Sequence, residues 1–217
     1  MNKILYSLVL TIFLFVNNET FAQLNNNLDE SFQKVIEYIA SNDFKKLKNT
    51  YDHLSLVDSI YIKALEISEG DISENLLALT FATLPFDKMV VGIPVINSTV
   101  NLQLQEVDSV LFKTKNVNLP SQLFFDSPLN GDKDKLAHFF GNAFLSYNFS
   151  VFNISKILGI FVELFEESFL VSGGLDSRDI TVNYLGEFYG KMLNNNNKLL
   201  PSEVLSLYSL MHIKIYN

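Results

Sequence analysis

Apolar residues recur every three or four positions in two parts of the chain, residues 28–84 and residues 134–213. That spacing places the apolar side chains on one face of a helix, so it predicts amphipathic helices in both parts. In the first part Ser41 is a typical helix cap, and a later helix is capped by Asp71 or Ser73 and stopped by Pro85. We therefore expect an N-terminal helical region that precedes a C-terminal helical bundle.

The C-terminal part divides into four helical segments, because turn-forming residues interrupt its apolar pattern. Gly173 and Gly174 form one such turn, the asparagine run 194–197 forms another, and Pro201 suits the first position of a helix. The pattern predicts helices over residues 134–147, 155–170, 177–193 and 201–213.

The pattern changes between residues 89 and 115, where β-branched residues cluster and apolar positions alternate with polar ones. Alternation of this kind is typical of strands, and we expect two or three short ones. Residues 119–131 that follow combine proline, asparagine and glycine with phenylalanine, as in an aromatic loop. The predicted fold is mainly α, with a small β element around residues 89–115; an α+β fold is the alternative.

The first 22 residues have the layout of a secretory signal peptide. Lys3 precedes an apolar run from Ile4 to Val16, and Thr20-Phe21-Ala22 forms a small-x-small cleavage site. The apolar run is shorter than the ~20 residues that span a bilayer. We expect cleavage near Ala22, no mature transmembrane helix, and an exported protein of the periplasm or the outer membrane.

The mature chain then has three predicted regions, an N-terminal helical region, short strands with the aromatic loop, and a C-terminal helical region. Their bounds are residues 23–88, 89–131 and 132–217. The sequence is 48% hydrophobic, which is enough for a sizeable core, and its net charge of -8 argues against a nucleic-acid partner. It has no cysteine, so disulfides, thiolate catalysis and zinc-thiolate sites are excluded.

Two polar pairs stand four residues apart on predicted helices, which places the members of each pair on one face. They are Asp134 with His138, and Asp179 with Asn183. Asp134 is expected to cap its helix and to orient the imidazole of His138. On the helix between the two pairs, Glu163 is embedded among apolar residues and is expected to face inward. Together these residues predict one polar site shared by three helices.

Other residues beside these pairs complete the predicted site. Lys135 and Arg178, the single arginine of the chain, either neutralise the carboxylates or bind an anionic group. Gly186 and Gly190 form a small-x-x-x-small stripe that permits close approach of a neighbouring helix.

The order of these residues resembles a known family pattern. The chain has Asp134-Lys135 followed by His138-Phe139, a glutamate on the next helix, and then D-x-x-x-N-x-x-G-x-x-x-G from Asp179. Residues 132–192 are thereby similar to the YfiM-like exported bacterial proteins, a family of unknown function, and more distantly to the VanZ-like proteins. The resemblance implies site positions and no reaction; the positions are Asp134, Lys135, His138, Phe139, Glu163, Asp179, Asn183, Gly186 and Gly190.

Three roles for the polar residues stay open: a buried network that fixes helix register, a ligand or metal site, and a catalytic site. One functional hypothesis is a non-enzymatic envelope protein that binds a lipid, glycan or protein through the aromatic loop. The other is a metal-assisted hydrolase of an envelope lipid or glycan, with His138 as base, Glu163 and Asp179 as metal ligands or orienting groups, and Asn183 positioning the substrate. A divalent metal is the one cofactor that these residues suggest.

Overall fold

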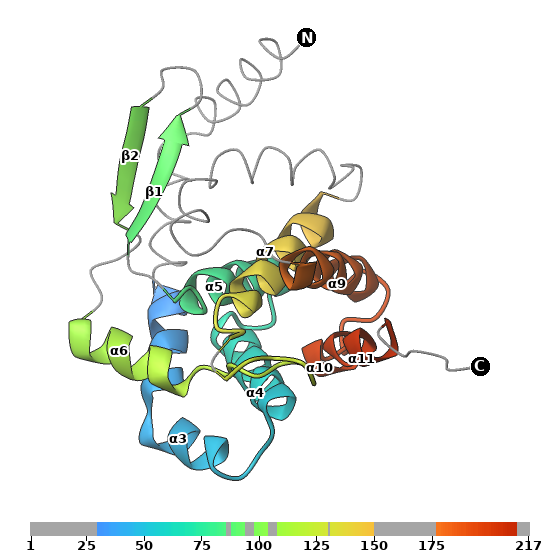
Figure 1. The fold of residues 1–217 in the computed structure, drawn as a ribbon, viewed down its shortest axis with the longest axis horizontal. Helices are drawn as coiled ribbons and strands as arrows, with labels where there is room; N and C mark the ends of the chain where they lie inside the picture. The colour runs from blue at the N-terminus through green and yellow to red at the C-terminus, as the bar shows by residue number, and fades with distance from the viewer. Residues whose placement is uncertain are drawn as a thin grey trace.

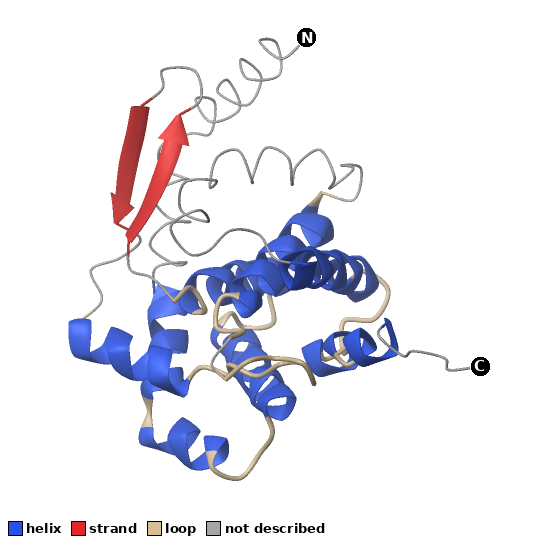
Figure 2. Cartoon of the chain, viewed as in Figure 1, coloured by secondary structure: helices blue, strands red, loops and turns tan. Residues whose placement is uncertain are grey.

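The structure is a computed structural model that describes residues 30–85, 88–93, 98–103, 108–129, 131–149 and 177–211. The described residues are mainly helical, which confirms the predicted fold class (Figures 1 and 2). Among them, no helix is both long and apolar enough to cross a membrane. The predicted signal peptide and the predicted helix over residues 155–170, which carries Glu163, lie outside the described residues.

The N-terminal helices begin at polar caps, as the sequence predicted. Residues 30–40 are helical and are followed by α3 (Asn42–Lys48), α4 (His53–Ile67) and α5 (Ile72–Ala82). The Ser41 hydroxyl accepts the Phe44 N–H at 3.1 Å, and the Asp71 carboxylate accepts the Glu74 N–H at 3.0 Å. Asp71 is thus the cap of α5, because it satisfies an N–H group that the helix itself leaves without an acceptor.

The segment from residue 88 to residue 118 forms a hairpin and then a helix. Strands β1 (Lys88–Ile93) and β2 (Ser98–Gln103) pair antiparallel, with Lys88 opposite Gln103. The expectation of strands up to residue 115 was wrong, because α6 covers Ser109–Asn118. Its first turn is fixed by the Asp108 carboxylate, which accepts the N–H groups of residues 110 and 111 at 2.8 and 3.0 Å.

The C-terminal part contains α7 (Lys135–Asn148), α9 (Ser177–Leu193), α10 (Pro201–Leu205) and α11 (Leu207–Met211). The predicted helix over residues 177–193 is confirmed, and Pro201 occupies a first-turn position. The prediction of one continuous helix from residue 201 was wrong, because a turn at Ser206 separates α10 from α11. The Ser206 hydroxyl bonds back to the Glu203 carbonyl at 3.0 Å, a contact that competes with helix continuation.

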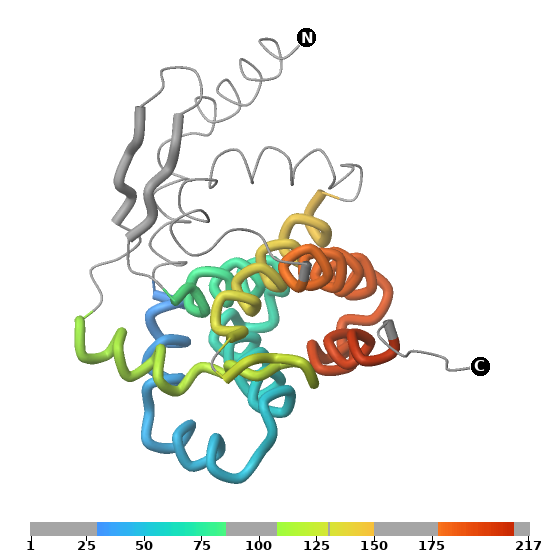
Figure 3. Tube along the Cα trace, in the orientation of Figure 1, coloured from blue at the N-terminus to red at the C-terminus, as the bar shows by residue number. Residues whose placement is uncertain are grey.

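Helices α7 and α9 pack side by side and run in the same direction (Figure 3). Contacts between them advance together along both helices, from Lys135–Asp179 through Asn142–Asn183 to the bond from the Ser146 hydroxyl to the Glu187 carbonyl. The two N-terminal ends therefore lie at the same end of the bundle, and the first turns of both helices meet there. Helix N-termini favour nearby negative charge, so carboxylates in both first turns are stabilised.

Two glycines set the close approach of α9 to α7, as their spacing predicted. A Cβ atom on Gly186 would lie 2.3 Å from the Phe139 carbonyl oxygen, and one on Gly190 would lie 2.2 Å from the Ala143 carbonyl oxygen. No side chain fits at such distances, so the two backbones approach more closely than any other residue type allows.

Aromatic residues fill the core beneath this contact. The Phe139 ring is fully buried and stacks on the Tyr189 ring at 5.2 Å, while the Tyr61 ring meets Tyr189 edge-on at 5.9 Å. α7 also packs against α5, and α10 packs against α4 and α9. Phe139, which the family resemblance placed among the site residues, is therefore a core residue of the bundle.

Candidate functional site

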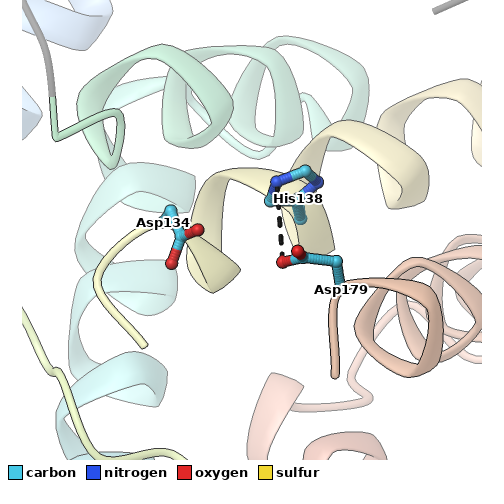
Figure 4. A group of neighbouring side chains, drawn as sticks. All are labelled: Asp134, His138 and Asp179. Carbon is cyan, nitrogen blue, oxygen red and sulfur yellow. Dashed lines mark ion pairs between the residues drawn. The ribbon is translucent and has the colours of Figure 1, made fainter. Parts of the chain in front are cut away.

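Three side chains from the first turns of α7 and α9 converge at one end of the bundle (Figure 4). They are Asp134, His138 and Asp179, and one ligand atom from each lies within 4.8 Å of the others. His138 Nε2 is 3.9 Å from Asp179 Oδ1. The Asp179 side chain is 4% exposed and that of His138 is 11% exposed, so the group lies at the edge of the core. An Asp/His/Asp group of this size is a donor set that divalent metals accept.

Lys135 lies between the two carboxylates of this group. Its Nζ atom is 2.5 Å from Asp179 Oδ1 and 3.2 Å from Asp134 Oδ2, and its side chain is only 4% exposed. Asp134 occupies the N-cap position of α7, as predicted, but its side chain accepts no capping hydrogen bond. Asp134 has helical backbone angles instead of the extended ones of most caps, and its carboxylate contacts Lys135.

Two asparagines link this group to the interior of the α7–α9 contact. Asn142 Nδ2 donates to Asn183 Oδ1 and to the His138 carbonyl, each at 2.8 Å. Asn183 in turn makes a side-chain hydrogen bond with His138. Asn142 was not predicted from the sequence, although it stands four residues after His138 on the same helix. The predicted pair Asp179 and Asn183 thus faces the N-terminal half of α7.

The environment of His138 favours its neutral form. Burial is the largest cause and lowers the pKa of the imidazole, and the Lys135 ammonium lowers it too. The carboxylates of Asp179 and Asp134 oppose this shift but do not reverse it. A neutral imidazole keeps a lone pair, so His138 retains the chemistry of a base or a metal ligand.

Arg178, at the start of α9, binds a carboxylate outside this group. Its Nη1 atom is 3.3 Å from Oδ1 of Asp132, a fully buried residue. Asp132 Oδ2 accepts the Leu123 N–H at 2.9 Å and also the Ser127 hydroxyl. Asp132 was missed by the sequence analysis, and its position at the end of the aromatic loop was the only signal for it. Its contacts fasten that loop to the start of α9.

The fastened loop buries one phenylalanine and exposes the next. Phe124 stacks on Tyr208 of α11 with ring centroids 3.9 Å apart. Phe125 is 68% exposed and Leu129 is 81% exposed. Both side chains are therefore largely in solvent, although the Phe125 ring also lies 6.0 Å from that of Tyr208, on a loop that Asp132 and the Phe124–Tyr208 stack attach to the bundle.

The predicted site residues fall into three groups. Asp134, Lys135, His138, Asp179 and Asn183 form one hydrogen-bonded cluster, which we call the α7–α9 cluster. Phe139, Gly186 and Gly190 lie in the helix contact beneath it. Arg178 holds Asp132, and Glu163 is outside the described residues.

Chemically, the cluster combines a neutral imidazole, two carboxylates, an ammonium group and an amide. No protein-family model matches this chain, and it has no match among curated proteins or solved structures. A functional assignment consequently depends on the cluster and the loop themselves.

Proposed function

We propose that this is an exported bacterial envelope protein that binds an apolar envelope component through Phe125 and Leu129. In this proposal the α7–α9 cluster is a structural joint that fixes the two parallel helices. The observation that carries the proposal is the exposure of these two side chains, 68% and 81%, on a loop that is otherwise anchored.

Anchoring matters because a loop that is already ordered loses little conformational entropy when it binds. The Phe124–Tyr208 stack and the contacts of Asp132 order the residues on both sides of Phe125. Exposed apolar side chains on such a support are typical of contact surfaces. Single exposed apolar residues are common on protein surfaces. The proposal therefore depends on the position of Phe125 and Leu129 on an ordered loop.

Two features of the sequence support an envelope location. Residues 1–22 have the layout of a signal peptide. The motif that resembles the YfiM-like and VanZ-like pattern includes residues of α7 and α9, and its polar members on these two helices lie together in the α7–α9 cluster. Cell fractionation tests the location directly: the full-length protein should be released with the periplasm or recovered with the outer membrane.

The binding proposal is tested with the double variant F125S/L129S. The matched control is V110S/V117S, because Val110 and Val117 on α6 are 69% and 66% exposed and lie outside the loop. Binding is measured by co-sedimentation with phospholipid vesicles and with purified peptidoglycan. We expect F125S/L129S to lose at least about tenfold in affinity for one of them, since each buried apolar side chain contributes about 1.5–3 kcal/mol.

The control should bind as the wild type does, and both variants should keep the wild-type melting temperature. Equal binding by the two variants would show that the loop is not the contact surface. Absence of wild-type binding to the vesicles would reject an apolar lipid partner, and absence of binding to peptidoglycan would reject a glycan partner.

A metal-assisted hydrolase is the second candidate, and the convergence of Asp134, His138 and Asp179 within 4.8 Å favours it. In that case His138 is the base, the two aspartates hold the metal, and Asn183 positions the substrate or the imidazole. The test is hydrolysis of carboxylic and phosphate esters in the presence of Zn²⁺ or Mn²⁺. A true site should lose on the order of a hundredfold or more in H138Q, whereas equal rates in both proteins would refute this function.

A further inference from the structure

The cation of the α7–α9 cluster is part of the chain itself. We propose that the Lys135 ammonium occupies the position that a divalent metal would take among Asp134, His138 and Asp179, and that it excludes metal from the cluster. The inference concerns the specificity of the cluster and is independent of what the aromatic loop binds, but it is incompatible with the metal-assisted hydrolase, the second candidate function.

The space beside the Asp179 carboxylate limits where a metal ion can bind. A metal that coordinates a carboxylate oxygen lies about 2.0–2.2 Å from it. The Lys135 nitrogen already lies 2.5 Å from Asp179 Oδ1, which is the same oxygen that lies 3.9 Å from His138 Nε2. An ion bound between that oxygen and the imidazole would therefore have to share Asp179 Oδ1 with the ammonium group.

The positive charge of Lys135 also opposes metal binding. Two carboxylates in the cluster face one ammonium, and Lys135 contacts both, at 2.5 Å and 3.2 Å. At an effective dielectric constant of 20, two like unit charges about 4 Å apart repel strongly enough to weaken binding on the order of a thousandfold. Without Lys135 this repulsion would be absent, and the two carboxylates would keep their attraction for a divalent cation.

Arg178 does not take the place of Lys135, because its guanidinium contacts a different carboxylate. Arg178 stands next to Asp179 in the sequence, but its guanidinium is paired with Asp132 at 3.3 Å. Lys135 enters the cluster from the first turn of α7 with a buried side chain, so its ammonium is held in place by packing along its stem. Lys135 is thus the residue that decides which cation the cluster contains.

The test compares Co²⁺ and Zn²⁺ binding by the wild type, K135M and K135M/D179N. Titration calorimetry gives the affinities, and the visible absorption of bound Co²⁺ reports its coordination. We expect K135M to bind one metal ion at least about a hundredfold more tightly than the wild type. K135M/D179N should lose that gain, because the second substitution removes one of the three ligands.

A folding defect in K135M would not prevent the test, because K135Q keeps a polar side chain of similar length and because the wild type is tested directly. Paramagnetic Mn²⁺ should leave the His138 ring resonances of the wild type sharp. The inference is overturned when Mn²⁺ broadens these resonances at micromolar concentration, or when folded K135M and K135Q bind metal no more tightly than the wild type. Neither result bears on vesicle or peptidoglycan binding, so the two proposals fail separately.

Discussion

Lys115 is fully buried on α6, and replacing it with methionine should stabilise the protein at neutral and acidic pH. Its Nζ atom donates to the Leu84 carbonyl at 2.6 Å and lies 4.4 Å from the centre of the Phe112 ring. Burial lowers the pKa of this amine from its ordinary 10.5 to about 7. Below pH 7 the folded protein therefore contains a buried ammonium that is fully solvated in the unfolded chain.

The size of the effect follows from the two pKa values. A difference of one pKa unit corresponds to about 1.4 kcal/mol, so the shift from 10.5 to about 7 costs the folded state about 5 kcal/mol below pH 7. The folded pKa is the lower one, so this cost is fully present below pH 7 and disappears as the pH rises toward 10.5. Methionine removes this cost and in addition loses the hydrogen bond that the neutral amine makes to the Leu84 carbonyl, about 1 kcal/mol.

We expect K115M to be more stable than the wild type by about 4 kcal/mol at pH 6, and the stability difference to change by about 4 kcal/mol between pH 6 and pH 10. Urea denaturation followed by circular dichroism at pH 6, 8 and 10 measures this difference. The control is K113M, since Lys113 is exposed on the same helix and should give a small, pH-independent effect. A difference between K115M and wild type that does not vary with pH would refute the reasoning.

Two further substitutions test the packing of α9 and of the loop. G186A should destabilise the protein by about 3 kcal/mol or more, because its Cβ would lie 2.3 Å from a backbone oxygen of Phe139. The control is G141A, whose Cβ would meet the side chain of Thr80, with the methyl group at 3.3 Å. In the same thermal melts G141A should cost less than G186A. D132A should cost about 3–5 kcal/mol, since it leaves Arg178 without its carboxylate. Limited proteolysis should then cut D132A in the loop before any other segment, and cleavage at the wild-type rate would contradict the role of Asp132.

The sequence predicted the helices well where local signals and the apolar pattern agreed. Ser41 and Asp71 cap helices by bonds to residues three positions away, and such short-range contacts are readable from the chain alone. The prediction of strands was wrong over the residues of α6, because a local cap was overlooked there. Asp108 was an unrecognised cap, and one capping carboxylate outweighed the β-branched residues that follow it.

The candidate site was predicted in its members but not in its connections. Spacing placed Asp134 with His138 and Asp179 with Asn183, since residues four apart share a helix face. Spacing does not show which residue of the opposite helix each one meets. Lys135 was expected either to neutralise carboxylates or to bind an anion, and only the tertiary contact at 2.5 Å assigns it to Asp179.

Residues whose role depends on burial were the hardest to predict. A lysine in an amphipathic helix usually lies in solvent, so nothing local marks Lys115 as a core residue. Asp132 likewise resembles an ordinary loop aspartate until Leu123, Ser127 and Arg178 surround it. In both cases the environment comes from segments distant in the sequence, and these meet only after folding.

The sequence by itself determined the helical class, several helix boundaries and the polar residues of the α7–α9 cluster, because these depend on periodicity and caps within a few residues. The tertiary structure alone decided that α7 and α9 run parallel, which brings both first turns to one end of the bundle. That direction places Lys135 between two carboxylates and Arg178 on a third. Helix direction is set by packing and chain connection, which the pattern of any single helix does not encode.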